Sequence, residues 1–225
     1  MMDTVPSLVA FGSLAHWPVP EQLDLLRRFL LDSALLQPVI QSLEDLNTLA
    51  GALSSGDPTL NVLTIQSAAD DLKQWIEDGK SASLSKELRN AMLMPMTVIT
   101  QAVQYLNVLQ QSNGIQHASI LESVGTKGGV QGFCAGLLTA VALASSTSED
   151  MIGIHVAISV KLAFCIGVYV DLDQAHHGGT YSTLAVRWKE PTTLKDLEQL
   201  VERYIGVSQG CFKSRMGPVY PSLLT

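Results

Sequence analysis

The segment at residues 132–136, Gly-Phe-Cys-Ala-Gly, carries the residues best suited to covalent chemistry. It matches the G-x-S-x-G pattern of a nucleophile elbow, with Cys134 in place of the serine. A nucleophile of this kind lies on a tight strand-to-helix turn, where Gly132 and Gly136 let neighbouring backbone approach closely. A helix beginning near Ala135 would direct free N–H groups toward the sulfur and stabilise a thiolate or an oxyanion. A structural cysteine in a glycine-rich turn is the alternative interpretation.

Other polar residues do not form a convincing metal site. His176 and His177 are adjacent in the chain, so their side chains cannot easily face one ion. Asp171 and Asp173 lie nearby and are more typical of solvated carboxylates in a loop. We therefore predict no metal ion and no bound cofactor.

The elements that must position Cys134 can be predicted from the spacing of apolar residues. A buried strand is expected at residues 7–11, ended by Gly12, and an apolar helix should begin directly after the elbow. A second apolar helix is expected over about residues 152–170. Helices dominate, with short buried strands between them, which indicates the α/β class.

The other segments mostly follow helical spacing. Residues 21–53 form an apolar helical run that Pro38 should break or kink. A further helix is expected at residues 68–77, Ser85 opens a short one, and Pro95 suits the first position of a longer one. The last expected elements are a strand at residues 180–188, a helix at 192–203 and a strand at 204–208.

The composition excludes several classes of protein. The chain has 225 residues, of which 47% are hydrophobic and 16% charged, and this excludes a disordered chain. A net charge of −7 without a basic run argues against nucleic-acid binding. Three widely spaced cysteines indicate a reducing compartment rather than a disulfide scaffold. The N-terminal segment carries Asp3 and no basic region, so no secretory signal is expected.

The apolar stretch at residues 152–170 is long enough to cross a membrane. It contains His155 and Lys161, and a central lysine costs about 3 kcal/mol on insertion. A buried helix in a folded core is therefore the preferred interpretation, and no membrane partner is expected.

The segment around Cys134, GFCAGLLTAVALASS, resembles the active-site segment of a known family. That family is the starter-unit acyl-carrier-protein (ACP) transacylase domain of fungal non-reducing polyketide synthases, which is similar to malonyl-CoA:ACP transacylases. The resemblance covers about residues 5–207. Further segments agree in the family's order, namely SLVAFGSLA at 7–15, MPMTVITQAVQYLNVLQ at 94–110, ISVKLAFCIGVYVD at 158–171 and STLAVRW at 182–188.

The resemblance implies a transacylase mechanism. Cys134 would take an acyl group from acyl-CoA or acyl-ACP and pass it to the phosphopantetheine thiol of an acyl-carrier protein or polyketide synthase. The backbone N–H of Ala135 and the turn at Gly12, Ser13 and Leu14 would donate hydrogen bonds to the oxyanion. Many relatives have Asp-Gln where this chain has Ser13-Leu14, but a backbone donor could survive that change. Such a protein would be cytoplasmic and serve secondary metabolism.

The resemblance also implies an acyl preference. Malonyl-specific relatives carry an arginine that pairs with the substrate carboxylate, and Ile166 occupies the matching position here. An apolar residue there favours a monoacyl group without a free carboxylate, such as acetyl or a longer fatty acyl chain. The alternative is that Ile166 is simply a core residue.

The family's catalytic histidine has no match in this chain, which therefore resembles a C-terminally truncated member. The implied layout is an α/β-hydrolase-like large subdomain at residues 1–179, the start of a ferredoxin-like subdomain at 180–207 and an atypical tail at 208–225. None of the five histidines matches the family's base, and His16, which follows the first turn, is the most interesting substitute. A solvated or structural histidine is the alternative interpretation of His16. A catalytically incompetent remnant that only binds a carrier protein or synthase partner is the alternative function.

Overall fold

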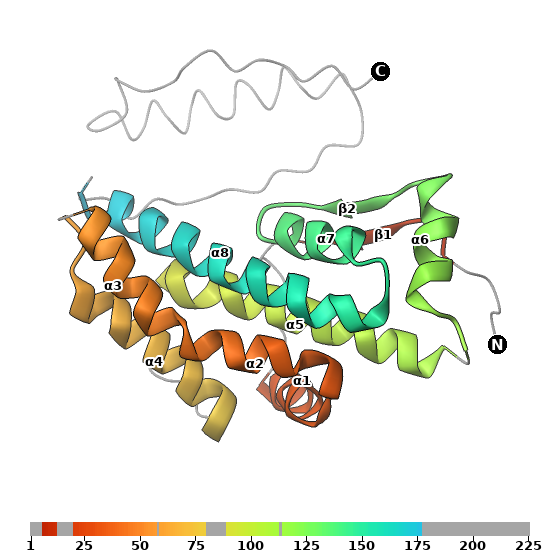
Figure 1. The fold of residues 1–225 in the computed structure, drawn as a ribbon, viewed down its shortest axis with the longest axis horizontal. Helices are drawn as coiled ribbons and strands as arrows, with labels where there is room; N and C mark the ends of the chain where they lie inside the picture. The colour runs from red at the N-terminus through yellow and green to blue at the C-terminus, as the bar shows by residue number, and fades with distance from the viewer. Residues whose placement is uncertain (1–5, 13–19, 58, 80–88, 113, 177–225) are drawn as a thin grey trace, which may run out of the picture. The chain divides into compact units, whose positions relative to one another are not determined.

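The computed structural model describes residues 6–12, 20–57, 59–79, 89–112 and 114–176. Most of this part of the chain is helical, and Figure 1 shows the helices beside two parallel strands. The arrangement is compatible with the predicted α/β class, although helices far exceed strands. The elements are β1 (Val9–Phe11), α1 (Pro20–Asp32), the 3₁₀ helix η1 (Ala34–Leu36), α2 (Gln37–Glu44), α3 (Leu46–Gly56), α4 (Val62–Asp78), α5 (Arg89–Gln111), α6 (His117–Gly125), β2 (Val130–Gly132), α7 (Gly136–Ser145) and α8 (Glu149–His176).

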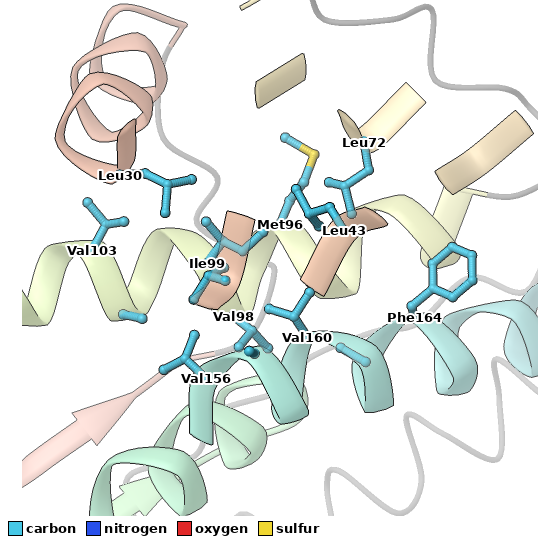
Figure 2. Packing of buried hydrophobic residues seen from close by; sticks show 14 of the residues in the cluster. Leu30, Leu43, Leu72, Met96, Val98, Ile99, Val103, Val156, Val160 and Phe164 are labelled. Carbon is cyan, nitrogen blue, oxygen red and sulfur yellow. The ribbon is translucent and has the colours of Figure 1, made fainter. Parts of the chain in front are cut away.

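The long helices α5 and α8 pack side by side at the centre of the described residues (Figure 1). Their contact is apolar, and Figure 2 shows Val98 of α5 with Val160 and Phe164 of α8 in the buried cluster. Gly167 allows the two helices to approach closely, because a Cβ there would lie 2.4 Å from the carbonyl oxygen of Asn90. Burial of apolar surface between these helices contributes to a hydrophobic core that extends from α1 to α8.

The apolar helix predicted over about residues 152–170 is confirmed as α8. Its side chains at Ile152, Val156 and Val160 are fully buried. In the part of the chain that the structure describes, α8 alone has the length and composition to cross a membrane, and more than half of its most apolar window is buried inside the protein.

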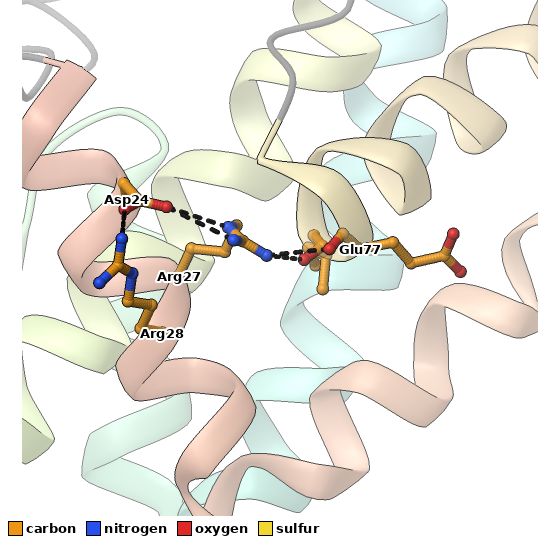
Figure 3. A network of polar contacts seen from close by, with 5 residues as sticks. Asp24, Arg27, Arg28 and Glu77 are labelled. Carbon is orange, nitrogen blue, oxygen red and sulfur yellow. Dashed lines mark hydrogen bonds and ion pairs between the residues drawn. The ribbon is translucent and has the colours of Figure 1, made fainter.

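A polar contact at Arg27 joins α1 to the C-terminal end of α4 (Figure 3). The Arg27 guanidinium donates to the carbonyl oxygens of Ile76 and Glu77 at 2.7 and 3.0 Å. Asp24 accepts from Arg27 at 3.4 Å and from Arg28 at 2.6 Å. Asp24 therefore holds the Arg27 guanidinium from within α1. The last carbonyls of a helix lack partners within that helix, and Arg27 therefore supplies a cap across the interface.

The two strands form a short parallel ladder, with Val9 opposite Val130 and Phe11 opposite Gly132. The strand expected within residues 7–11 is confirmed, but the prediction that it is buried is wrong, since its residues are half-buried or exposed. The physical reason is that the sheet has only two strands among the described residues, so each strand has an unpaired edge.

Two prolines lie near helix starts, and only one of them behaves as expected. Pro38 interrupts the long helical run, as predicted, and occupies the first turn of α2, where its missing N–H costs no hydrogen bond. The prediction that Pro95 starts its helix is wrong, because Pro95 lies inside α5. The Asp171 carboxylate accepts from the backbone N–H groups of Asn90 and Ala91 at 3.0 and 2.9 Å. This distant cap lets the helix begin upstream of the proline.

Several predictions fall outside the described residues. The short helix expected at Ser85 is one of them, and so are Ser13, Leu14 and His16. The same holds for the strands expected at 180–188 and 204–208, the helix expected at 192–203, and the subdomain boundaries at 179/180 and 207/208.

Candidate active site

Cys134 lies on the tight turn between β2 and α7 in a left-handed backbone conformation. Its φ is +56°, and among the described residues it is the one non-glycine residue with positive φ. The left-handed region costs an ordinary residue about 1–2 kcal/mol, so the surrounding structure must hold the turn in place. The residue is exposed, which makes the thiol accessible to a reagent. A strained, exposed cysteine between a strand and a helix has the backbone geometry of a nucleophile elbow.

The glycines on either side of the cysteine are required by close backbone contacts. A Cβ on Gly132 would lie 2.3 Å from the carbonyl oxygen of Gly136, where no atom fits. A Cβ on Gly136 would lie 2.5 Å from the carbonyl oxygens of both Phe11 and Gly12. The elbow is therefore packed directly against the end of β1, and this explains the G-x-C-x-G spacing in physical terms.

Backbone hydrogen bonds fix the turn that carries Cys134. Phe133 N–H donates to the carbonyl oxygen of Phe11 at 3.0 Å, and Leu137 N–H donates to that of Cys134 at 3.0 Å. Ala135 is 1% exposed and precedes the first residue of α7. No hydrogen bond within the described residues uses its N–H group. The start of α7 therefore offers an amide donor that has no partner among the described residues, and the positive end of the helix dipole, next to the cysteine.

One polar side chain that the sequence analysis did not single out lies beside this turn. Gln101 of α5 donates from Nε2 to the carbonyl oxygen of Gly12 at 2.9 Å. Its Oε1 accepts from the Thr139 hydroxyl of α7 at 2.7 Å. The sequence offered only a weak signal for this role, namely a polar residue within an otherwise apolar helical segment.

Two histidines in the described part of the chain have structural hydrogen bonds. His117 is 1% exposed, its Nε2 lies 2.8 Å from the Ser146 carbonyl oxygen, and its Nδ1 lies 2.6 Å from the Tyr105 hydroxyl. A carbonyl oxygen only accepts, so Nε2 carries the proton and Nδ1 accepts from Tyr105. Burial raises the pKa of Tyr105 well above its usual value, which keeps that hydroxyl a donor. His155 Nδ1 contacts the Ser146 hydroxyl at 3.0 Å.

These contacts place both rings next to Ser146, which follows the C-terminal end of α7, whereas Cys134 precedes the N-terminal end of that helix. No hydrogen bond within the described residues joins His117 or His155 to the Cys134 thiol. His16 and His177 lie outside the described residues, and His176 is the last residue of α8.

Asp171 differs from its prediction. It was expected to be a solvated loop carboxylate, but it is 4% exposed within α8 and caps α5 through Asn90 and Ala91. Burial raises the pKa of its carboxyl, against hydrogen bonds that lower it. The described residues contain no group of three or more histidine, cysteine, aspartate or glutamate side chains that could hold a metal ion.

Ile166 lies on the outer face of α8 and is 37% exposed. It continues a row of exposed apolar side chains at four-residue spacing, formed by Ile154, Ile158 and Leu162. The alternative in which Ile166 is simply a core residue is therefore not what the structure shows. Its assignment to an acyl pocket stays a prediction.

Comparison with known proteins adds family membership to this geometry. Residues 60–210 match the family described as "Starter unit:ACP transacylase in aflatoxin biosynthesis". The chain belongs to this starter-unit:ACP transacylase family. The match includes the elbow, α7 and α8, so the resemblance inferred from the sequence is confirmed.

Family relatives include very large synthases. The chain is 45% identical over 203 residues to methylphloroacetophenone synthase of Cladonia uncialis, covering 89% of this chain and 8% of that protein. It is 35% identical over 202 residues to 5-methylorsellinic acid synthase of Aspergillus terreus, with 89% and 8% covered. It is 36% identical over 199 residues to the non-reducing polyketide synthase Preu3 of Preussia isomera, with 88% and 8% covered. The chain thus spans less than a tenth of the length of these relatives.

Proposed function

We propose that this chain is a starter-unit acyltransferase of polyketide biosynthesis that carries its acyl group as a thioester on Cys134. The observation that carries the proposal is the left-handed, exposed cysteine two residues before the start of α7, in a chain of the starter-unit:ACP transacylase family. The proposal extends to the fold, in which β1, β2 and α7 would belong to an α/β-hydrolase-like acyltransferase subdomain.

The proposed reaction has two half-reactions with the same geometry. The Cys134 thiolate attacks the thioester carbonyl carbon of an acyl-CoA, and the carbonyl oxygen takes the negative charge of the tetrahedral intermediate. The C–S bond to CoA then breaks, and the CoA thiolate leaves and takes up a proton from solvent. In the second half the phosphopantetheine thiolate of a carrier protein attacks the acyl-Cys134 thioester in the same way, and the Cys134 thiolate is released.

Two groups would stabilise the oxyanion in this account. The N–H of Ala135, which has no partner among the described residues, is one donor, supported by its position at the start of α7. The turn that begins at Gly12 would supply the other, and the packing of the Gly12 carbonyl against Gly136 supports this by bringing the end of β1 next to the start of α7. Ile166 would favour an acyl chain without a free carboxylate. No metal or cofactor takes part, and the substrates are acyl-CoA and a phosphopantetheinyl carrier protein in the cytoplasm.

A second function is favoured by one observation. His117 and His155 are both engaged in structural hydrogen bonds, so neither is free to act as a base for Cys134. Without a base from outside the described residues, the chain could bind a carrier protein or a synthase partner and become acylated slowly without turning over. Efficient loading of a carrier protein at catalytic concentrations of the chain would exclude this binding role.

The proposal is tested by incubating the chain with acetyl-CoA or hexanoyl-CoA and measuring its intact mass. We expect one added acyl group on the wild-type chain and none on Cys134→Ala. Cys165→Ala is the matched control, because Cys165 is partly buried in α8 and burial raises the pKa of its thiol. This control should be acylated like the wild type. Equal labelling of the wild type and Cys134→Ala would overturn the proposal.

A further inference from the structure

We infer that Gln101 is a positioning residue for the oxyanion site, because it ties the turn after β1 to the helix that follows Cys134. The inference rests on the function proposed above. It starts from a side chain on α5 that hydrogen-bonds to two segments far away in the sequence, at Gly12 and at Thr139.

The chemistry of the two partners fixes the orientation of the Gln101 amide. The Gly12 carbonyl oxygen can only accept, so the NH₂ group of the amide must face it, at 2.9 Å. The amide oxygen then faces Thr139, whose hydroxyl donates at 2.7 Å. Thr139 is fully buried on α7, one turn after the helix begins, so it provides a rigid anchor. Both ends of the amide are satisfied, and the Gly12 carbonyl, which can only accept, excludes the reversed orientation.

The Gly12 carbonyl is held on a second side by backbone packing. A Cβ on Gly136 would lie 2.5 Å from its oxygen, so this carbonyl sits directly against the first residue of α7. Fixing the carbonyl of Gly12 therefore also holds Gly136 in place, and Gly136 directly follows Ala135, whose N–H is a proposed oxyanion donor.

Loosening an oxyanion donor should slow only a step in which negative charge develops on the carbonyl oxygen. Removing one oxyanion donor from an enzyme typically lowers its rate about 100- to 1,000-fold. A donor that is loosened rather than removed should lose less, so we expect the rate of Cys134 acylation to fall about 10- to 100-fold in Gln101→Met. Methionine keeps a similar volume in the partly buried site but cannot donate to Gly12.

The experiment compares two reactions of the same thiol in the full chain. Acylation by acetyl-CoA passes through a tetrahedral oxyanion, whereas alkylation by iodoacetamide displaces iodide without one. Both rates are followed by mass spectrometry of the peptide that contains Cys134. We expect Gln101→Met to slow acylation at least tenfold and to leave alkylation within about twofold. Gln104→Met is the matched control, because Gln104 is an exposed glutamine three residues further along α5.

Thr139 provides a second route to the same result. Thr139→Val removes the hydroxyl that anchors Gln101 while preserving the shape of the buried side chain, and it should slow acylation in the same direction. Thr139→Ser restores the hydroxyl and should recover most of the rate. These two variants test the inference even if Gln101→Met folds poorly.

The outcomes separate the inference from the proposed function. If acetyl-CoA acylates the wild type and Gln101→Met at the same rate, the role of Gln101 is overturned and the proposed function stands. An equal loss of acylation and alkylation would also overturn it, since that pattern indicates a general structural defect. A wild-type chain that acetyl-CoA does not acylate would overturn the proposed function, and the inference with it.

Discussion

The contact between α5 and α8 and the turn at Cys134 are held together in opposite ways. Between the helices, apolar side chains such as Val98, Val160 and Phe164 are fully buried and supply the stabilisation. At the elbow, backbone contacts backbone, and Gly132 and Gly136 have no room for even a Cβ. The first region depends on how much apolar surface is buried, and the second depends on one local backbone conformation.

This difference determines how each region should respond to substitution. Truncating a core side chain should lower the free energy of unfolding in proportion to the volume removed. Truncating a nearby exposed side chain on the same helix should change it little. The elbow should instead be sensitive to a single added methyl group, and a substitution that relieves the strained φ should stabilise it.

Phe164→Ala should give the largest loss of stability. Phe164 is fully buried on α8, and truncating such a side chain costs about 3–5 kcal/mol through lost burial and a residual cavity. Leu162→Ala is the control on the same helix, because Leu162 is 47% exposed. Urea unfolding followed by circular dichroism gives both free energies of unfolding. A loss below about 1 kcal/mol for Phe164→Ala would contradict the assignment of this contact as the core.

Gly136→Ala should destabilise the elbow by about 3 kcal/mol, because the new Cβ meets two backbone carbonyl oxygens that cannot rotate away. Gly51→Ala is a matched control within α3, where a Cβ meets nothing within 4 Å. That control should be stabilised by about 0.5–1 kcal/mol through its helix propensity. Thermal unfolding of the two variants measures both changes. A Gly136→Ala variant as stable as the wild type would show that the elbow is not closely packed.

Cys134→Gly should stabilise the chain by about 1 kcal/mol, because glycine adopts a φ of +56° without the steric cost that cysteine has. Cys134→Ala removes the same sulfur but keeps the Cβ, so it should bring no comparable gain. The difference in free energy of unfolding between these two variants isolates the backbone strain from the loss of the thiol. Equal stabilities would mean that the left-handed turn carries no cost.

The smallest effect should be a pH dependence due to Asp171. Burial raises the pKa of this carboxyl above its ordinary value of 3.8, so the folded state binds the proton more readily than the unfolded state. The free energy of unfolding should therefore fall as the pH rises from that value through the raised pKa. Asp171→Asn carries no charge and should lack this fall, while Asp32→Asn, at an exposed position, should retain it. Parallel pH profiles for the wild type and Asp171→Asn would contradict the prediction.

The elbow could be predicted from sequence because its constraint is local. Gly132, Cys134 and Gly136 lie within five residues, and their types report directly on a tight turn. The long apolar helix α8 was predictable for a similar reason. What could not be predicted depends on distant pairs, such as Asp171, whose cap on Asn90 moved the start of α5 upstream of Pro95. The contact of Gln101 with the carbonyl of Gly12 is of the same kind.

The central claim, an acyl thioester on Cys134 formed at a strained elbow, is tested most directly by locating the acyl group. The chain is incubated with hexanoyl-CoA, digested and mapped by mass spectrometry, before and after neutral hydroxylamine, which cleaves thioesters. The account predicts one hexanoyl group on the peptide that contains Cys134, removed completely by hydroxylamine. A hexanoyl group on Cys165, a hydroxylamine-resistant adduct, or no acylation at all would contradict it.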